Sequence, residues 1–157
     1  MSYSIPPHKV ERAIAVHFAE TFSEVSSDAW VWPRMVEDMT QGDEWVSPYF
    51  INDYSRVRQR KGSGGSQKHQ AEFQTVVHCY VKPTTDTQRV LVIASAVAQV
   101  FDQRVIQVYD YDNSSSLMGS VRFDEAEELD LTEGMQENYQ DDSQHAVVTI
   151  AARVYGQ

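Results

Sequence analysis

The stretch Val90–Phe101 reads V-L-V-I-A-S-A-V-A-Q-V-F and is the most apolar block of the chain. It is too short for a membrane span, which needs ~20 such residues. Thr85 and Gln88 stand just before it in the S/T-x-x-E/Q relation of a capping box, and this relation predicts that a helix begins there. The block therefore predicts a helix over about residues 86–102 rather than a buried strand.

The two sides of this predicted helix differ. Its apolar side has the i, i+3, i+4, i+7 spacing of a core-facing helix and consists of Val90, Ile93, Ala94, Val97, Val100 and Phe101. The other side carries small or uncharged residues, namely Ser95, Ala96, Ala98 and Gln99. Because small side chains allow close approach, we expect this side to meet either another element or a neighbouring subunit.

Segments typical of strands flank the helix. Residues 72–81 and 104–111 are rich in β-branched and aromatic residues. Residues 118–123 are a further candidate strand. The last segment, 145–155, has two largely apolar or small faces, which predicts a strand in the middle of a sheet or against another chain. The acidic run 124–130 reads as a solvated edge.

The N-terminal third predicts a second helix and a short strand. Prolines at positions 6 and 7 suit the first turn of a helix over about residues 6–25. Its apolar stripe is formed by Val10, Ile14, Phe18, Phe22 and Val25. A short strand is expected at residues 29–33, and its two tryptophans belong to a core or to an interface; we favour the core.

A long β-hairpin is predicted from Tyr54 to Val81, with the low-complexity tract K-G-S-G-G-S at its tip. Five of the 13 Lys and Arg residues lie on this arm, so it is either a solvated loop or a tip that becomes ordered on a partner. The candidate interface residues are Arg56, Arg58, Arg60, Lys61 and Lys68, together with Arg153 on the final strand.

Together these elements predict an α+β fold in a single domain, 1–157. We expect a mixed or antiparallel sheet with a long β-hairpin arm, packed by two helices over about residues 6–25 and 86–102.

Composition limits the function. Lys+Arg number 13 against Asp+Glu 23, a formal charge of -10, which argues against a nucleic-acid-binding module. The single cysteine, Cys79, excludes an internal disulfide and a multi-cysteine zinc site, and it reads as a small buried hydrophobe. The start of the chain lacks the pattern of a signal peptide, so we expect synthesis in the cytoplasm and no membrane association.

Motifs that carry chemistry are missing. The glycine tract lacks the G-K-[ST] ending of a phosphate loop, the five histidines show no H-x-x-x-H or H-E-x-x-H pairing, and no serine lies in G-x-S-x-G. We therefore expect no enzyme, no catalytic residues, no cofactor and no metal site.

The order of elements resembles that of the tail terminator (tail-completion) proteins of long-tailed bacteriophages, the lambda-like type. The resemblance rests on the helix at 10–25, the Ala29-Trp30-Val31-Trp32-Pro33 segment, the hairpin, the helix at 90–101 and the final strand. Two departures are the long Gly/Ser tip and the extended acidic insert at 124–142.

This resemblance implies a structural virion protein that forms a hexameric ring at the head-proximal end of the tail tube. Such a ring ends tube polymerisation and docks to a neck or head-completion protein, while genome DNA passes through its lumen without specific binding. Acidic residues facing a lumen would let DNA slide past. Two alternatives stay open: another neck component, such as a head-closure or connector protein, and a small acidic immunity-type binding protein.

Overall fold

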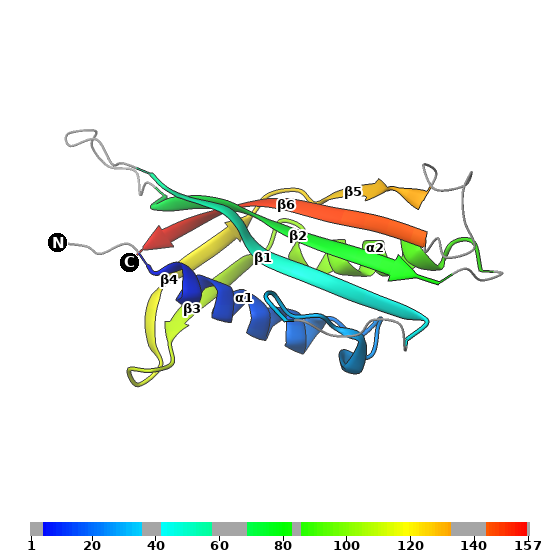
Figure 1. The fold of residues 1–157 in the computed structure, drawn as a ribbon. Helices are drawn as coiled ribbons and strands as arrows, with labels where there is room; N and C mark the ends of the chain where they lie inside the picture. The colour runs from blue at the N-terminus through cyan, green and yellow to red at the C-terminus, as the bar shows by residue number, and fades with distance from the viewer. Residues whose placement is uncertain (1–4, 36–41, 58–68, 83–85, 133–143, 157) are drawn as a thin grey trace.

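The computed structural model describes residues 5–35, 42–57, 69–82, 86–132 and 144–156. Over these ranges the chain forms one antiparallel sheet with two α-helices packed on one of its faces (Figure 1). This confirms the predicted α+β class. The helices are α1 (Pro7–Thr21) and α2 (Arg89–Phe101); the strands are β1 (Glu44–Arg56), β2 (Ala71–Val81), β3 (Val105–Asp110), β4 (Ser116–Phe123), β5 (Glu127–Asp130) and β6 (Gln144–Gly156).

Strand β6 is the centre of the sheet, as predicted for the final segment. The strand order is β1-β2-β6-β4-β3, and β5 also pairs with β6. On one side β6 pairs with β2 along its whole length, from Gln144↔Val81 to Val154↔Ala71. On the other side its first half pairs with β5 and its second half with β4. The sheet is open, with β1 and β3 at the ends of this path.

Strands β1 and β2 form the predicted hairpin. Their register runs from Glu44↔Val81 to Arg56↔Ala71, with two irregularities around Asn52. Asp53 has a positive φ of 57° there, as expected at a bulge. The tip of the hairpin, residues 58–68, lies outside the described residues.

Helix α2 buries all six residues of the predicted apolar stripe. Its predicted start was wrong, because Gln88 is the residue that precedes the helix, with no side-chain cap bond, and the first helical residue is Arg89. The Gln88 N–H instead donates to Asp86 Oδ1 at 3.0 Å, so a turn formed by Asp86 precedes the helix. Thr85 lies outside the described residues.

Helix α1 is shorter than predicted and ends at Thr21. Phe22 is extended, and the Thr21 hydroxyl donates to the His17 carbonyl at 2.6 Å, a side-chain bond of a kind that competes with continued helix. Phe22 and Val25 are nevertheless buried, at 3% and 2% exposure. The apolar spacing therefore identified core residues correctly beyond the point where the helix ends.

The expected strand at residues 29–33 is a single bridge. Ser27–Ala29 form a 3₁₀ turn, Trp30 bridges Val46 in parallel, and the Val31 N–H donates to the Val46 carbonyl at 2.9 Å. Pro33 has no N–H to extend this pairing. Trp30 is buried and Trp32 packs against the core, which confirms the core interpretation.

The acidic run proves to be an edge strand. Residues Glu127–Asp130 pair with Ala146–Thr149 of β6, and all four are exposed. The solvated edge is confirmed, whereas its regular pairing was not predicted, because acidic residues have low strand propensity and here β6 supplies the template. Among the described residues, no helix is long and apolar enough to span a membrane.

The two ends of the described chain meet beside β4. A Cβ atom added to Gly119 would lie 2.8 Å from the Ile5 side chain, 3.1 Å from Gly156 and 2.1 Å from the Tyr155 carbonyl oxygen. The Tyr54 hydroxyl also donates to the Ile5 carbonyl at 3.0 Å. Glycine at 119 therefore permits Ile5 and the end of β6 to approach β4 closely, and any side chain at this position would block that approach.

The core is centred on Phe18 of α1, which is fully buried. Its ring contacts aromatic rings directly after α1, in the Trp30 segment, in β1 and in α2, with centroids 4.8–6.4 Å away: Phe22, Trp30, Trp32, Phe50 and Phe101. This one side chain joins α1, the Trp30 segment, β1 and α2.

We expect Phe18→Ala to lower the free energy of unfolding by ~3–5 kcal/mol, since it removes a large buried ring and leaves a cavity. Urea denaturation followed by circular dichroism measures this loss. Ala19→Ser, at the exposed neighbouring position, serves as the control and should change stability by no more than ~0.5 kcal/mol. A loss below 1 kcal/mol for Phe18→Ala would contradict the central position of this ring.

Candidate assembly surfaces

One face of the sheet carries no covering helix. Along β2 and β6 every second residue is buried under the helices, and the residues between them are partly or fully exposed. We call their side of the sheet the open face. Its residues on these strands are Glu72, Gln74, Val76, His78, Tyr80, His145, Val147, Thr149, Ala151, Arg153 and Tyr155.

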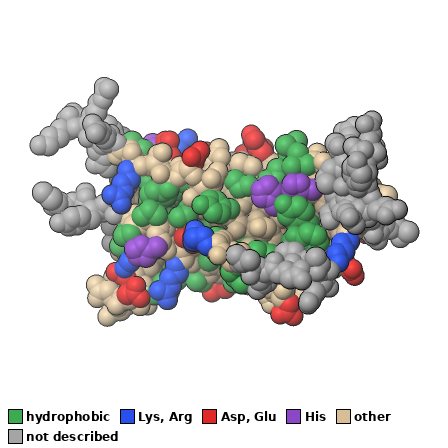
Figure 2. Space-filling view, in the orientation of Figure 1, with side chains coloured by type: hydrophobic (Ala, Val, Ile, Leu, Met, Phe, Trp, Pro, Cys, Tyr) green, Lys and Arg blue, Asp and Glu red, His purple; other side chains and the backbone are tan. Residues whose placement is uncertain are grey.

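A stack of rings occupies the half of the open face near the start of β6. Trp45 stacks on Tyr80 at 5.1 Å between centroids, and Tyr80 stacks on His145 at 4.4 Å. His145 in turn lies 5.1 Å from His78, with His78 Nδ1 2.9 Å from His145 Nε2. Figure 2 shows histidines lying together among hydrophobic side chains on this face. We call these four residues the aromatic–histidine cluster.

Partial burial sets the protonation of this cluster. Desolvation lowers the pKa of His78. Desolvation also lowers the pKa of His145; the neighbouring His78 adds to this effect, and Asp130 opposes it. Desolvation raises the pKa of Tyr80. All three side chains are therefore held in their neutral forms at neutral pH, so the cluster is an uncharged surface in an otherwise acidic protein.

Apolar surface continues from the cluster toward the Trp30 segment. A hollow of about 450 Å³ lies between residues 31–35 and β1, and His78 forms part of its wall. Met35 and Tyr49 at this hollow are 41% and 42% exposed. On the other side Leu129 of β5, 57% exposed, pairs with Val147 and therefore lies on the open face as well.

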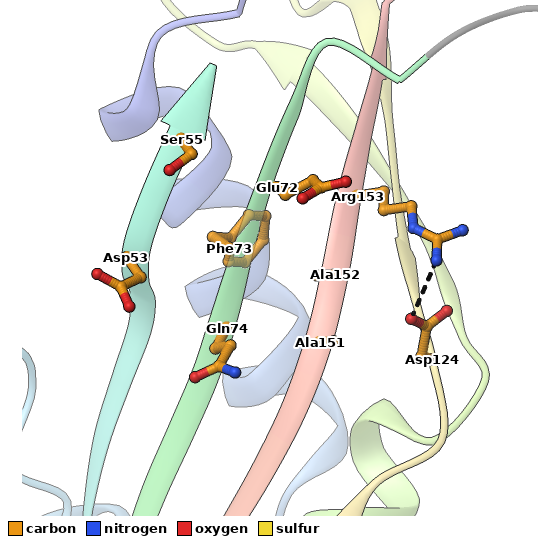
Figure 3. Close-up of a pocket in the computed structure, with 9 residues that line it drawn as sticks. All are labelled: Asp53, Ser55, Glu72, Phe73, Gln74, Asp124, Ala151, Ala152 and Arg153. Carbon is orange, nitrogen blue, oxygen red and sulfur yellow. Dashed lines mark ion pairs between the residues drawn. The ribbon is translucent and has the colours of Figure 1, made fainter. Parts of the chain in front are cut away.

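The other half of the open face is polar. A hollow of about 450 Å³ there is lined by Asp53, Ser55, Glu72, Phe73, Gln74, Asp124, Ala151, Ala152 and Arg153 (Figure 3). Arg153 lies 3.7 Å from Asp124 and is paired in register with Glu72, whose carboxylate contacts His69 at 2.6 Å. Acidic groups thus outnumber Arg153 in this hollow.

The predicted interface residues fall into two groups. Arg153 lies in the polar hollow, and Arg56 is exposed at the end of β1, paired with Ala71. Arg58, Arg60, Lys61 and Lys68 lie outside the described residues. Arg56 and Arg153 come from strands separated by β2, so the structure places them on one sheet without a direct contact between them.

The outer surface of α2 is a second uncharged surface, on the opposite side of the molecule from the open face (Figure 1). Residues 90–101 of the helix carry no charged side chain, and Glu24 borders this surface. Leu91 and Val92 are 43% and 47% exposed, and beside them lies a hollow lined by Glu24, Gln88, Leu91, Val92, Ser95, Ala96 and Gln99. This agrees with the small side predicted for the helix, with two large aliphatic residues added at its start.

Arg89 ties α2 to two other elements. Its guanidinium donates to both carboxylate oxygens of Glu44 at 2.7 Å and to Glu24 Oε1 at 2.5 Å. These bonds hold the pKa of Glu44 below its ordinary value and raise that of Arg89. The start of α2 is thereby fastened to β1 and to the segment after α1, so the α2 surface is held at a constant position relative to the sheet.

Sequence reasoning missed the aromatic–histidine cluster. His78 and His145 are 67 residues apart and show no local pairing motif. Only the register between β2 and β6 could have revealed the pair. In this register His78 pairs with Val147 and Tyr80 pairs with His145, so the two histidines are diagonal neighbours on one face.

Comparisons with known proteins give information on the fold and none on the function. No protein-family model matches the chain, and no curated protein matches it. A solved structure, whose name carries no functional description, is 10% identical and has a TM-score of 0.63, covering 96% of this chain and 96% of its own. The chain and that solved structure therefore share a similar fold over nearly their whole lengths.

We expect acidification to weaken the fold through the two histidines. Their pKa values are lowered in the folded chain, so between the unfolded value of 6.5 and the folded values the unfolded chain binds more protons. Stability contributed by the neutral pair is therefore complete above pH 6.5 and falls as the pH drops below it. Thermal unfolding at pH 7.5 and 5.5 measures the effect.

The double variant His78→Gln/His145→Gln should lose less Tm between these two pH values than the wild type. His8→Gln, at an exposed histidine, is the control and should keep the wild-type loss. An equal loss in the double variant would show that the pair does not titrate in this range.

Proposed function

We propose that this chain is a structural virion protein, a tail terminator that forms a ring at the head-proximal end of a long phage tail. The proposal rests on the order of elements resembling that family and on an open α+β sheet with surfaces suited to assembly. The ring would end tube polymerisation and offer a docking face for a neck protein.

The observation that carries the proposal is a pair of uncharged surfaces on opposite sides of the subunit. One is the aromatic–histidine half of the open face, and the other is the outer side of α2 around Leu91 and Val92. The chain has a net charge of -10, so two exposed regions without charged side chains stand out from the rest of its surface. Both are apolar enough to contribute to a stable contact with another protein chain.

Two different surfaces on opposite sides favour a head-to-tail contact. In such a heterologous contact the α2 surface of one copy meets the open face of the next, and repetition closes into a ring when the rotation allows. Closure at six subunits follows from the family resemblance. The α2 surface suits close packing because Ser95 and Ala96 beside Leu91 and Val92 are small.

The basic arm is proposed to contact the tail tube or a neighbouring subunit. Arg56 is exposed at the end of β1, where the chain continues toward the basic tip residues. The polar hollow is a candidate for a surface past which DNA slides, because its carboxylates repel phosphate.

Deleting the gene from the phage that carries it tests the function. We expect tails of variable, excessive length in electron micrographs of the lysate, because tube growth would lack its stop. Expression of the intact chain in trans should restore uniform length. Normal-length tails without heads would assign the chain to another neck component, and normal attached tails would refute a role in the tail.

The proposed contact makes a second prediction in the purified protein. Val92→Arg places a charge on the α2 surface and Leu129→Arg places one on the open face; each should prevent ring formation in light scattering at high concentration or on tubes. Ala19→Arg, at an exposed site on α1, is the matched control and should assemble.

Mixing the two variants distinguishes the kind of contact. Val92→Arg retains an intact open face and Leu129→Arg retains an intact α2 surface, so a head-to-tail contact predicts a heterodimer from the mixture and none from either variant alone. A mixture that stays monomeric while the wild type forms rings would contradict this contact. A wild type that stays monomeric even on tubes would favour the immunity-type alternative.

A further inference from the structure

We propose that His78 and His145 form a binding site for one late first-row divalent cation, of the class Zn²⁺, Ni²⁺ or Cu²⁺. The inference stands on the geometry of the aromatic–histidine cluster and does not depend on the proposed assembly function.

The separation of the two ring nitrogens suits one metal ion. His78 Nδ1 and His145 Nε2 lie 2.9 Å apart. Two imidazole nitrogens bound to one ion at ~2.0–2.1 Å lie about 2.9 Å apart when the angle at the metal is a right angle, and somewhat farther apart in a tetrahedron. The observed separation belongs to an N–H···N hydrogen bond and is close to that of two adjacent ligands, so binding needs both rings to turn until their lone pairs point to one ion, without movement of the strands.

The backbone holds the two histidines in place. His78 pairs with Val147 in the β2–β6 ladder, and His145 pairs with Tyr80, so the histidines are diagonal neighbours on adjacent central strands. Tyr80 stacks on one face of the His145 ring at 4.4 Å, and Trp45 stacks on Tyr80 at 5.1 Å. A site held by two central strands loses little conformational freedom when the ion binds.

The protonation state suits metal binding. In the metal-free pair one ring N–H donates to the other ring nitrogen. Moving the protons to His78 Nε2 and His145 Nδ1 leaves both facing nitrogens with free lone pairs, and both rings stay neutral. Binding to the neutral pair therefore needs only this change of tautomer.

The ligand set defines the class of ion. Imidazole nitrogen suits zinc, copper and nickel, whereas magnesium and calcium prefer oxygen. Within the described residues no third histidine, cysteine or carboxylate joins the pair in a metal-binding group, so water fills the remaining positions. The two histidines are half-exposed on the open face, so an ion reaches them from solvent.

The test uses the full chain without an affinity tag, titrated with NiCl₂ at pH 7.5 in a calorimeter. We expect one ion per chain, and more than about tenfold weaker binding in His78→Gln and in His145→Gln, since even outer-shell substitutions cost that much. His69→Gln is the control and should bind as the wild type does, because His69 pairs with Glu72 outside the cluster.

A second measurement identifies the ligands directly. The electron paramagnetic resonance spectrum of the Cu²⁺-loaded chain should carry nitrogen hyperfine structure from two imidazoles, reduced in either single variant. Circular dichroism verifies that each variant is folded. Equal binding by wild type and both variants, no binding at millimolar ion, or a wild-type spectrum without nitrogen coupling would each overturn the proposal.

Discussion

One-sided burial of the central strand is the constraint on which the rest of the structure depends. Side chains of β6 alternate between burial in the core on the helix side and partial or full exposure on the open face. Because strand side chains alternate with a period of two, a slip of one residue would place every buried aliphatic group in water. The same register that secures the core therefore also places His145, Val147 and Thr149 on the open face, where the aromatic–histidine cluster is built.

The helical layer supports this arrangement from behind. Phe18 joins four parts of the chain through ring contacts, and Arg89 fastens the start of α2 to β1 and to the segment after α1. The two uncharged surfaces, on α2 and on the open face, are thus opposite sides of one packed unit. An assembly contact made by one surface has a defined orientation relative to the other, which is what a closed ring requires.

Sequence patterning predicted the fold well where local periodicity decides structure. The apolar stripe of α2, the burial of Phe22 and Val25, the hairpin and the central position of the last strand all followed from spacing and composition. The errors concern the ends of the helices, where a single polar contact determines the boundary. Asp86 has this role before α2, and Thr21 has it at the end of α1. The pairing of β5 depends on β6 as a template, and the histidine pair depends on register across 67 residues. Neither leaves a local signal.

The contact around Gly119 has a practical consequence for the shape of any assembly. Ile5 and Gly156 both lie against this glycine, so the first and last described residues lie at the same end of the molecule, beside the junction of β4 and β6. The cluster of rings lies toward the opposite end of β6, near its first residues. A linker joining Ile5 to Gly156 would need to cross only a short gap, which makes the described fold suited to circular permutation.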